Sequence, residues 1–311
     1  MKVLFVSSGN SKVGITPLIK NQGEALLQAG VELHYYAVKG KGISGYLKNI
    51  PRLREKIKEL RPDIIHAHYS LTAFMASLAG CQPLVVSLMG SDVKASKRYK
   101  WLIRCFAWLF RWRAIIVKSK DMFSDLGLAG VQIIPNGVNL ERFKPMSQSV
   151  CREQLGWESL KKHIVFPADP LRPEKDFDLA SAAVALLDEQ IEIHYFQNVP
   201  NEHTPYWYNA AHVVLMTSKW EGSPNAIKEA LACGCPIVST DVGDVAERTE
   251  GVDGCFVAKS RDPKEIAELL QKALTFPSRT TGHQHIMDME LDNQTIASKL
   301  FAIYQQFSTN C

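Results

Sequence analysis

Short apolar segments alternate with helix-length segments along the whole chain, and this alternation limits the fold most strongly. Such an order predicts parallel strands in each sheet, with helices covering both faces of the sheet. Five strands are expected in each half: 3–7, 32–38, 63–67, 84–88 and 114–117, then 163–167, 192–196, 213–217, 236–240 and 254–257. Helices are expected at 15–29, 70–78, 96–113, 179–188, 224–233, 263–274 and 294–307. A length of 311 residues suits two α/β domains, each large enough for its own core.

The composition is that of a globular protein. Hydrophobic residues make up 46% of the chain, an ordinary fraction for a soluble domain, and no apolar run approaches the roughly 20 residues that cross a bilayer. The start of the chain favours a buried first strand over a secretory signal. Seven cysteines without regular spacing indicate reduced thiols, so a cytoplasmic location is expected. For Cys233 and Cys235, packing is favoured over a metal or redox role.

Charge is divided unequally between the two halves. Residues 1–145 hold 22 Lys and Arg against 9 Asp and Glu, whereas the remainder holds 14 against 23. The first half is therefore strongly basic, although the net charge of the chain is only +4. A basic half favours anionic partners, namely membrane lipid, nucleic acid or a phosphorylated substrate. Nucleic acid is the least favoured of these partners, because no nucleic-acid-binding motif accompanies the charge.

The segment 219–229, Lys-Trp-Glu-Gly-Ser-Pro-Asn-Ala-Ile-Lys-Glu, combines a turn, a helix start and two carboxylates. Ser223 is a suitable N-cap, and Pro224 suits the first helical position. Backbone N–H groups at such a helix start bind phosphate. The carboxylates of Glu221 and Glu229 suit sugar and ribose hydroxyls. The segment therefore predicts a nucleotide-sugar site.

Together with Gly234-x-Pro236-Ile-Val and Asp241-Val-Gly243, this segment resembles glycosyltransferase family 4. Members of that family are retaining enzymes of the GT-B fold, so the resemblance implies an α/β protein with two Rossmann-like domains facing an interdomain cleft. It implies that Glu221 is catalytic and holds the donor sugar. The donor-binding residues that it implies here are Gly222, Ser223, Pro224, Asn225 and, at the ribose, Glu229. The alternative is a solvated helix that carries two unrelated glutamates.

Two cations, Arg172 and Lys175, follow the strand expected at 163–167 and suit a diphosphate leaving group. The family usually has Gly-Arg-Leu-x-x-x-Lys here. Aligned on Lys175, this chain has Asp169-Pro170 in place of Gly-Arg, and Arg172 comes two positions late. The resemblance implies a catalytic role for Lys175 and a donor-binding role for Arg172, with solvated surface cations as the alternative. Val199, after the strand at 192–196, is the expected contact of the nucleobase.

His66 and His68 end an apolar strand in the first half. At the carboxyl end of a strand in an open α/β sheet, side chains face the place where ligands bind. Alternation puts both histidines on one face, so their spacing would permit a metal, but two ligands are too few and no metal is expected. The resemblance instead places His68 against the donor sugar as a catalytic residue and gives His66 a structural role. Two packed histidines are the alternative.

Two further loops of the first half follow strands. The loop 9–14 lacks the glycine fingerprint of dinucleotide sites and the ending of an ATP loop, which disfavours a nicotinamide-dependent oxidoreductase. By the resemblance, Gly14 lets the backbone approach the donor, and a tight turn is the compatible alternative. Asp92, after the strand at 84–88, is the expected acceptor-side contact.

The segment 96–113 mixes tryptophan, phenylalanine and tyrosine with lysine and arginine. A basic aromatic helix can lie in a membrane interface, with Trp101, Trp108 and Trp112 as the inserted residues. Packing of the same helix in the core is the alternative. The basic first half favours the membrane, and hence an anionic lipid-linked acceptor at the inner face of the cell membrane.

The residues and the resemblance together predict a retaining, metal-independent glycosyltransferase of cell-surface polysaccharide synthesis. It would move a sugar from a nucleotide-diphosphate-sugar, with UDP-sugar favoured, to a glycan or lipid-linked acceptor. No cofactor is expected, because the nucleotide-sugar is a substrate. The alternatives are a non-catalytic binding protein of the same fold and a GT-B epimerase or phosphorylase.

Three parts of the chain are expected. Residues 1–145 form an acceptor-side domain, 146–290 form a nucleotide-sugar domain, and 291–311 hold a helix that crosses back to the first domain. The segment 133–145 contains a Pro-Asn-Gly turn that interrupts regular structure, and it is the expected linker. Asn139 replaces an Asp that is frequent in the family.

Overall fold

The computed structural model describes residues 1–93, 96–187 and 190–308 and divides into two compact units. Unit 1 comprises Met1–Gly137 and Asn293–Cys311, and unit 2 comprises Val138–Asp292. The first boundary thus falls before the expected residue 145, because Phe143 is buried in the core of unit 2. The last residue of the helix expected at 179–188 and the last three of the segment 291–311 lie outside the described residues.

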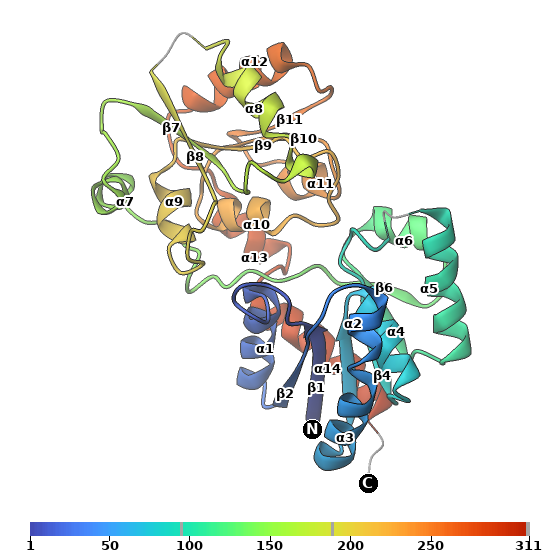
Figure 1. The fold of residues 1–311 in the computed structure, drawn as a ribbon. Coiled ribbons are helices and arrows are strands. Elements are labelled where there is room, and N and C mark those ends of the chain that lie inside the picture. The colour runs from blue at the N-terminus through green and yellow to red at the C-terminus, as the bar shows by residue number, and fades with distance from the viewer. Residues whose placement is uncertain (94–95, 188–189, 309–311) are drawn as a thin grey trace. The chain divides into compact units, whose positions relative to one another are not determined.

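Unit 1 is a parallel six-stranded sheet with helices on both faces (Figure 1). Its strand order is β2 (Glu32–Val38), β1 (Lys2–Ser8), β3 (Ile64–His68), β4 (Leu84–Ser87), β5 (Ala114–Val117), β6 (Val131–Ile133). Its helices are α1 (Pro17–Gln28), α2 (Gly42–Leu47), α3 (Ile50–Leu60), α4 (Ser70–Leu78), α5 (Lys97–Leu109), α6 (Lys120–Leu126) and α14 (Asn293–Phe307).

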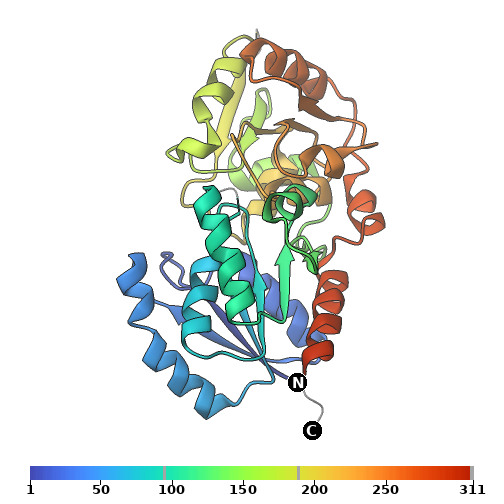
Figure 2. The ribbon, with the colours of Figure 1, turned by 90° about the vertical axis from the view of Figure 1, so that its right-hand side faces the viewer.

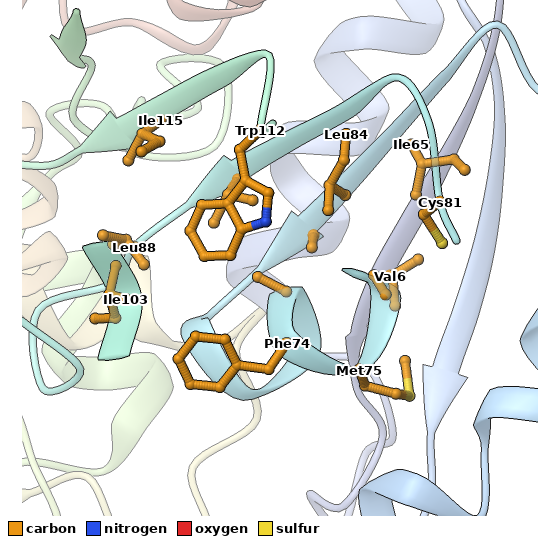
Figure 3. Close-up of a cluster of buried hydrophobic side chains, with 14 of the residues drawn as sticks. Val6, Ile65, Phe74, Met75, Cys81, Leu84, Leu88, Ile103, Trp112 and Ile115 are labelled. Carbon is orange, nitrogen blue, oxygen red and sulfur yellow. The ribbon is translucent and has the colours of Figure 1, made fainter. Parts of the chain in front are cut away.

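Alternating side chains of the inner strands build two cores, one on each face of this sheet. Leu4 and Val6 of β1 join one hydrophobic cluster, and Val3 and Phe5 join the other. Figure 3 shows part of the first cluster, where Trp112 lies among aliphatic side chains of the strands and near the ring of Phe74 from α4. A strand buried on both faces explains why the sequence shows continuous apolar runs rather than alternation.

Helix α14 completes unit 1 from the far end of the chain. It packs against the second cluster, and Figure 2 shows it in red along the sheet of unit 1. The Tyr304 hydroxyl lies 2.6 Å from Nδ1 of His66. This buried hydrogen bond ties the helix to the middle of β3.

Unit 2 is a parallel five-stranded sheet, also covered on both faces. Its strand order is β11 (Cys255–Ala258), β10 (Ile237–Thr240), β9 (Val213–Met216), β7 (Lys162–Phe166), β8 (Ile191–Tyr195). The helices are α7 (Gln148–Leu155), the 3-10 turn η1 (Pro173–Lys175), α8 (Phe177–Val184), α9 (Thr204–Ala210), α10 (Asn225–Ala232), α11 (Val245–Thr249), α12 (Pro263–Leu274) and α13 (Gly282–Asp288).

Two chain segments join the units, and they lie side by side. In unit 1, a Cβ on Gly137 would come within 2.8 Å of the Cα of Asn293. In unit 2, the N–H of Val138 donates to the carbonyl of Leu291 at 2.9 Å. The glycine of the Pro-Asn-Gly turn is thus required by a close backbone approach.

Ten strands lie where the apolar runs predicted them. The sixth strand of unit 1, β6, was not predicted, because its three residues run into the expected linker at 133–145, and neither were the helices α2, α3, α6, α7, α9, α11 and α13. The ranges of β2, β5, α4 and α12 agree with expectation, whereas α1 begins two residues late because Pro17 occupies its first turn. Helix α5 ends at Leu109, so Trp112 lies beyond it. Cys233 and Cys235 are buried, as the packing interpretation expects. Within the described residues, no helix has the length and apolar character needed to span a membrane.

Candidate functional site

The first strand of each sheet is an inner strand, with later strands of the chain on both sides of it. In unit 1, β1 lies between β2 and β3, and in unit 2, β7 lies between β8 and β9. Open α/β sheets bind ligands at the carboxyl ends of strands where the strand order reverses in this way. The loop after β1 holds Gly14 and the end of β3 holds His68, whereas the loops after β7 and β9 hold Lys175 and Glu221. Each sheet thus brings two predicted groups to its reversal point.

At the reversal point of unit 2, Lys175 and Glu221 form an ion pair between the two loops. Their side chains are 15% and 16% exposed. Oε1 of Glu221 also accepts a hydrogen bond from Oγ of Ser218 at 2.8 Å. The hydroxyl of Thr217 donates to the carbonyls of Lys175 and Asp176 at 3.1 and 2.8 Å. The Thr217 side chain, in the loop after β9, therefore holds the backbone of the loop after β7 in place.

The turn that follows Glu221 leads into α10. The helix begins at Asn225 with Pro224 in the N-cap position, so the expected N-cap, Ser223, lies one residue outside. The Ser223 hydroxyl instead accepts a hydrogen bond from Nζ of Lys228 at 3.2 Å. The first N–H groups of a helix have no intrahelical acceptor, and Oδ1 of Asn225 is buried without a hydrogen-bond partner among the described residues. The free N–H groups of this helix start can therefore bind an anion, and Oδ1 of Asn225 can accept a hydrogen bond from a hydroxyl group.

Lys228 is a site residue that the sequence analysis missed. Its side chain is fully buried, and burial lowers the pKa of its ammonium to about 8, with the nearby Asp244 acting against that shift. Asp244 itself accepts a hydrogen bond from Nε of the buried Arg248 at 2.9 Å. The sequence offered little signal for this position, because Lys228 lies outside the apolar face that Ala226, Ile227, Ala230 and Leu231 form on the predicted helix. A lysine there brings positive charge beneath the turn.

Glu229 follows Lys228 and accepts a hydrogen bond from the Tyr208 hydroxyl at 3.0 Å. Burial raises the pKa of Glu229, whereas the Tyr208 hydrogen bond and the charge of Lys228 lower it. Tyr208 comes from α9, so two helices position this carboxylate. Its expected contact with a ribose remains a prediction.

Gly243 supports the turn from the loop after β10. Its φ angle is +62°, and a Cβ at this position would lie 2.5 Å from the carbonyl oxygen of Gly222 and 3.2 Å from the carbonyl carbon of Glu221. Both the conformation and the space therefore require glycine. The Asp241-Val-Gly243 segment therefore packs directly against the turn after Trp220, and only glycine allows this contact.

The remaining predicted residues of unit 2 lie in neighbouring loops. The side chain of Arg172 is 55% exposed and pairs with Glu174, with Nη2 at 2.6 Å from the carboxylate. Val199 lies in the loop after β8, which runs beside the loop after β7, because the N–H of Phe196 donates to the carbonyl of Ala168 at 3.1 Å. Arg172 is thus held by a carboxylate of its own loop, and the roles of both residues remain predictions.

In unit 1, the two histidines have different surroundings. His66 is fully buried, and its Nε2 lies 2.9 Å from Oγ of Ser87, so both ring nitrogens have partners. The His68 ring stacks on His66 with centroids 4.2 Å apart and touches Phe5, but its buried Nε2 has no partner among the described residues. Burial, and secondarily Lys118, lowers the pKa of His68 to about 3. His68 is therefore a neutral imidazole with one nitrogen available for a ligand.

Gly14 and Asp92 occupy loops at the same edge of the unit 1 sheet. Gly14 has φ +72° and closes a turn with Ser11, which agrees with the tight-turn alternative. The buried carboxylate of Asp92 accepts hydrogen bonds from the backbone N–H groups of Ser70, Met89 and Gly90 at 3.1, 2.9 and 3.0 Å. Asp92 therefore fixes the start of α4 and its own loop, and contact with an acceptor remains a prediction.

Two family comparisons together cover most of the chain. The family described as "Glycosyltransferase Family 4" matches residues 18–142, and the family described as "Glycosyl transferases group 1" matches residues 165–275. The first match lies almost wholly in unit 1, and the second lies within unit 2. Both reversal points are thus inside the matched regions or beside them.

Among curated proteins, the chain is similar to a glycosyltransferase assigned to teichuronic acid biosynthesis in Bacillus subtilis, with 26% identity over 244 residues. That match covers 70% of this chain and 62% of the relative. A second relative is the UDP-Gal:alpha-D-GlcNAc-diphosphoundecaprenol alpha-1,3-galactosyltransferase of Escherichia coli, with 25% identity, covering 63% of this chain and 62% of the relative. The matches thus span less than two thirds of either relative.

Among solved structures, the chain is similar to the sucrose-phosphate synthase of Thermosynechococcus elongatus, with a TM-score of 0.84, 16% identity and 98% of each chain covered. It is also similar to Anabaena HepE in complex with UDP and glucose, with a TM-score of 0.77 and 18% identity. That match covers 98% of this chain and all of HepE.

Replacing Gly243 with alanine tests the support of the turn. Gly251 serves as the matched control, because its φ is +75° but a Cβ there would meet nothing within 4 Å. We expect Gly251→Ala to cost about 1 kcal/mol of unfolding free energy from backbone strain, and Gly243→Ala to cost roughly 1–3 kcal/mol more from the clash. Urea denaturation measures both values. Equal losses in the two variants would contradict the close approach.

The buried His68 predicts acid sensitivity. Its pKa is about 3 when folded and about 6.5 when unfolded, so between these values only the unfolded chain binds the proton and stability falls as pH falls. At pH 5 this histidine should contribute a loss of about 2 kcal/mol relative to neutral pH. Urea unfolding at pH 7.5 and 5 should show a smaller acid loss in His68→Asn than in the parent. The control His203→Asn, which changes an exposed histidine, should retain the full loss of stability between pH 7.5 and 5. An equal loss in His68→Asn and in the parent would contradict the low pKa of His68.

Proposed function

Because the chain belongs to glycosyltransferase family 4, we propose that it transfers a sugar from a nucleotide-diphosphate-sugar to a glycan or lipid-linked acceptor. Its fold is that of the GT-B glycosyltransferases. The observation that carries the proposal is the Lys175–Glu221 pair at the reversal point of unit 2, directly before the amide-bearing start of α10. We propose cell-surface polysaccharide synthesis as the setting, supported by the teichuronic acid relative.

The donor's charged and neutral parts have separate partners in the proposal. Lys175 and Arg172 take the diphosphate together with the first N–H groups of α10, and Lys228 adds charge beneath them. Glu221 takes the sugar hydroxyls, Glu229 takes the ribose, and the backbone near Val199 takes the base. Groups fixed before reaction stabilise the charge that develops on a departing diphosphate. UDP is the favoured nucleotide, in line with the UDP in the HepE complex and the UDP-Gal in the name of the Escherichia coli relative.

Unit 1 contributes the acceptor side. His68 contacts the donor sugar through its available Nε2, Gly14 allows a close backbone approach, and Asp92 orders the loop beside them. We propose retention through attack on the same face of the sugar, with a donor phosphate oxygen taking the acceptor proton and without a catalytic metal.

A donor assay tests the catalytic assignment. The chain is incubated with UDP-, GDP- and ADP-sugars, with and without acceptor extracts, and nucleotide release is measured. We expect acceptor-dependent release from one donor, and a loss of about 10²–10³-fold in Glu221→Ala. The control Glu268→Ala changes an exposed carboxylate of α12 and should retain full activity.

The other outcomes separate the alternatives. Binding of a nucleotide-sugar without turnover would identify a non-catalytic protein of this fold, and conversion without acceptor would identify an epimerase. Release that survives Glu221→Ala from every donor would show that the donor site is assigned wrongly.

We further propose that α5 contacts an anionic membrane at the cytoplasmic face. One side of the helix packs in the core through Ile103, whereas Trp101 and Trp108 are 64% and 82% exposed. Lys97, Trp101 and Trp108 lie within about 40° of one another around the helix axis. The sequence left core packing and membrane contact as alternatives for this helix. Here one side packs in the core, and the opposite side is free to contact a membrane. Trp112 lies beyond the end of α5 and is buried, contrary to the prediction that it inserts into a membrane: it is 8% exposed and donates from Nε1 to Oγ of Ser77 at 2.8 Å.

Flotation with anionic and neutral lipid vesicles tests this contact. We expect binding to anionic vesicles that weakens with salt, because lysine and arginine supply part of the attraction. The double variant Trp101→Ser, Trp108→Ser should lose most of this binding. The control Trp220→Ser removes a half-exposed tryptophan of unit 2 and should leave it intact. Equal binding by the double variant and the parent would exclude the interfacial role of α5.

A further inference from the structure

Three metal-ligating side chains meet at the edge of the unit 2 sheet. His163 lies on β7, and Glu192 and His194 lie two residues apart on the neighbouring edge strand β8. The two strands are parallel, with His163 opposite Glu192. One ligating atom from each side chain falls within 4.8 Å of the other two. The pairing of the strands therefore converges two imidazoles and a carboxylate.

The distances are close to those of a metal site. Nδ1 of His163 lies 2.9 Å from Nε2 of His194 and 4.0 Å from Oε2 of Glu192. Ligands about 2.0–2.1 Å from a tetrahedral Zn²⁺ stand roughly 3.3 Å apart. The imidazoles need to separate by only a few tenths of an ångström, and the Glu192 side chain, which is 43% exposed, has room to rotate inward.

The surroundings already orient the rings. Nε2 of His163 lies 2.7 Å from the carbonyl oxygen of Glu158, so Nε2 carries the proton and the lone pair of Nδ1 accepts a hydrogen bond from Nε2 of His194 at 2.9 Å. A metal would take the place of this His194 proton, which would move to Nδ1 of His194 and leave both facing nitrogens as ligands. The hydrogen bond from the second ring nitrogen of His163 to a carbonyl is usual for metal-binding histidines. His194 stacks on the indole of Trp157 with centroids 3.5 Å apart and planes 5° apart. Both rings are thus held in place without a metal.

The charges around the cluster permit a cation. Lys161 lies 3.8 Å from Glu192 and is 33% exposed, and it also pairs with Glu158. A bound cation would displace Lys161 from Glu192 and leave it paired with Glu158.

We propose that His163, Glu192 and His194 bind one divalent cation of the imidazole-preferring class, with Zn²⁺ as its representative. Two nitrogens and one carboxylate oxygen form a donor set that suits this class, with a fourth position open to water. The cation ties the edge strand β8 to β7 and thereby steadies the loop that follows β8. The proposal stands independently of the transferase proposal, because these residues have no part in the donor chemistry described above.

Metal binding to the full chain tests the proposal. After chelation and dialysis, Zn²⁺ is titrated calorimetrically, and Co²⁺ is titrated to detect the visible absorption of a tetrahedral complex. We expect one equivalent to bind, and His194→Ala and Glu192→Gln each to weaken binding by about 10–100-fold. Circular dichroism checks that His194→Ala is folded, and Glu192→Gln changes a side chain that is too exposed to govern folding.

Two matched controls separate this site from adventitious binding. Glu268→Gln makes the same charge change at an exposed carboxylate of α12, in the same unit but outside the cluster. His34→Ala removes a histidine that lies 2.9 Å from Glu32 on the edge strand of unit 1. Both controls should retain the bound equivalent. Binding weaker than about 1 mM, binding that survives His194→Ala and Glu192→Gln, or binding lost in His34→Ala would overturn the proposal.

Discussion

The position of the first strand inside each sheet is the constraint on which the candidate site depends. Strands β1 and β7 are buried on both faces and have a neighbouring strand on both sides. The chain therefore adds strands on one side of each and then crosses to the other side. Because all strands are parallel, their carboxyl ends meet at one edge. Loops that are distant in sequence, such as those holding Lys175 and Glu221, are thereby brought into contact. The meeting of these two loops follows from the order of the buried strands, whereas the residues that they carry come from local segments such as 219–229.

Close backbone approaches then fix the details that strand order leaves open. Gly243 lets the loop after β10 reach the backbone of Glu221 and Gly222, and Gly137 lets one connecting segment lie against Asn293. Both glycines occur in segments that resemble the family. Their presence there has a packing reason, since any larger residue would displace a neighbouring backbone.

The sequence predicted the strands well, because an apolar run of four or five residues between turn residues is typical of a buried strand. It predicted the site residues as groups at strand ends, but not their partners. The contact of His66 with Tyr304 joins residues 238 positions apart, and no local pattern reveals such a pair. Lys228 was missed because a lysine on a helix usually faces solvent. Trp112 was predicted to be exposed like Trp101 and Trp108 because the helix was expected to continue to residue 113. The helix ends at Leu109 instead, so its periodicity does not apply to Trp112. The short helices α7, α9, α11 and α13 carry too few turns for a periodic signal.

Each charged group proposed for the donor already has a partner: Lys175 has Glu221, Arg172 has Glu174, and Glu229 has Tyr208. Leaving a partly buried charge unpaired is costly, so a ligand that takes Lys175 must also satisfy Glu221. Free phosphate offers oxygens to the lysine, but its negative charge is repelled by the carboxylate. A free sugar offers hydroxyls to the carboxylate but no anion to the lysine. A nucleotide-diphosphate-sugar carries both groups in one molecule. Under the proposed function, the ion pair therefore favours the activated sugar over its separate parts, since only the intact donor exchanges both partners at once.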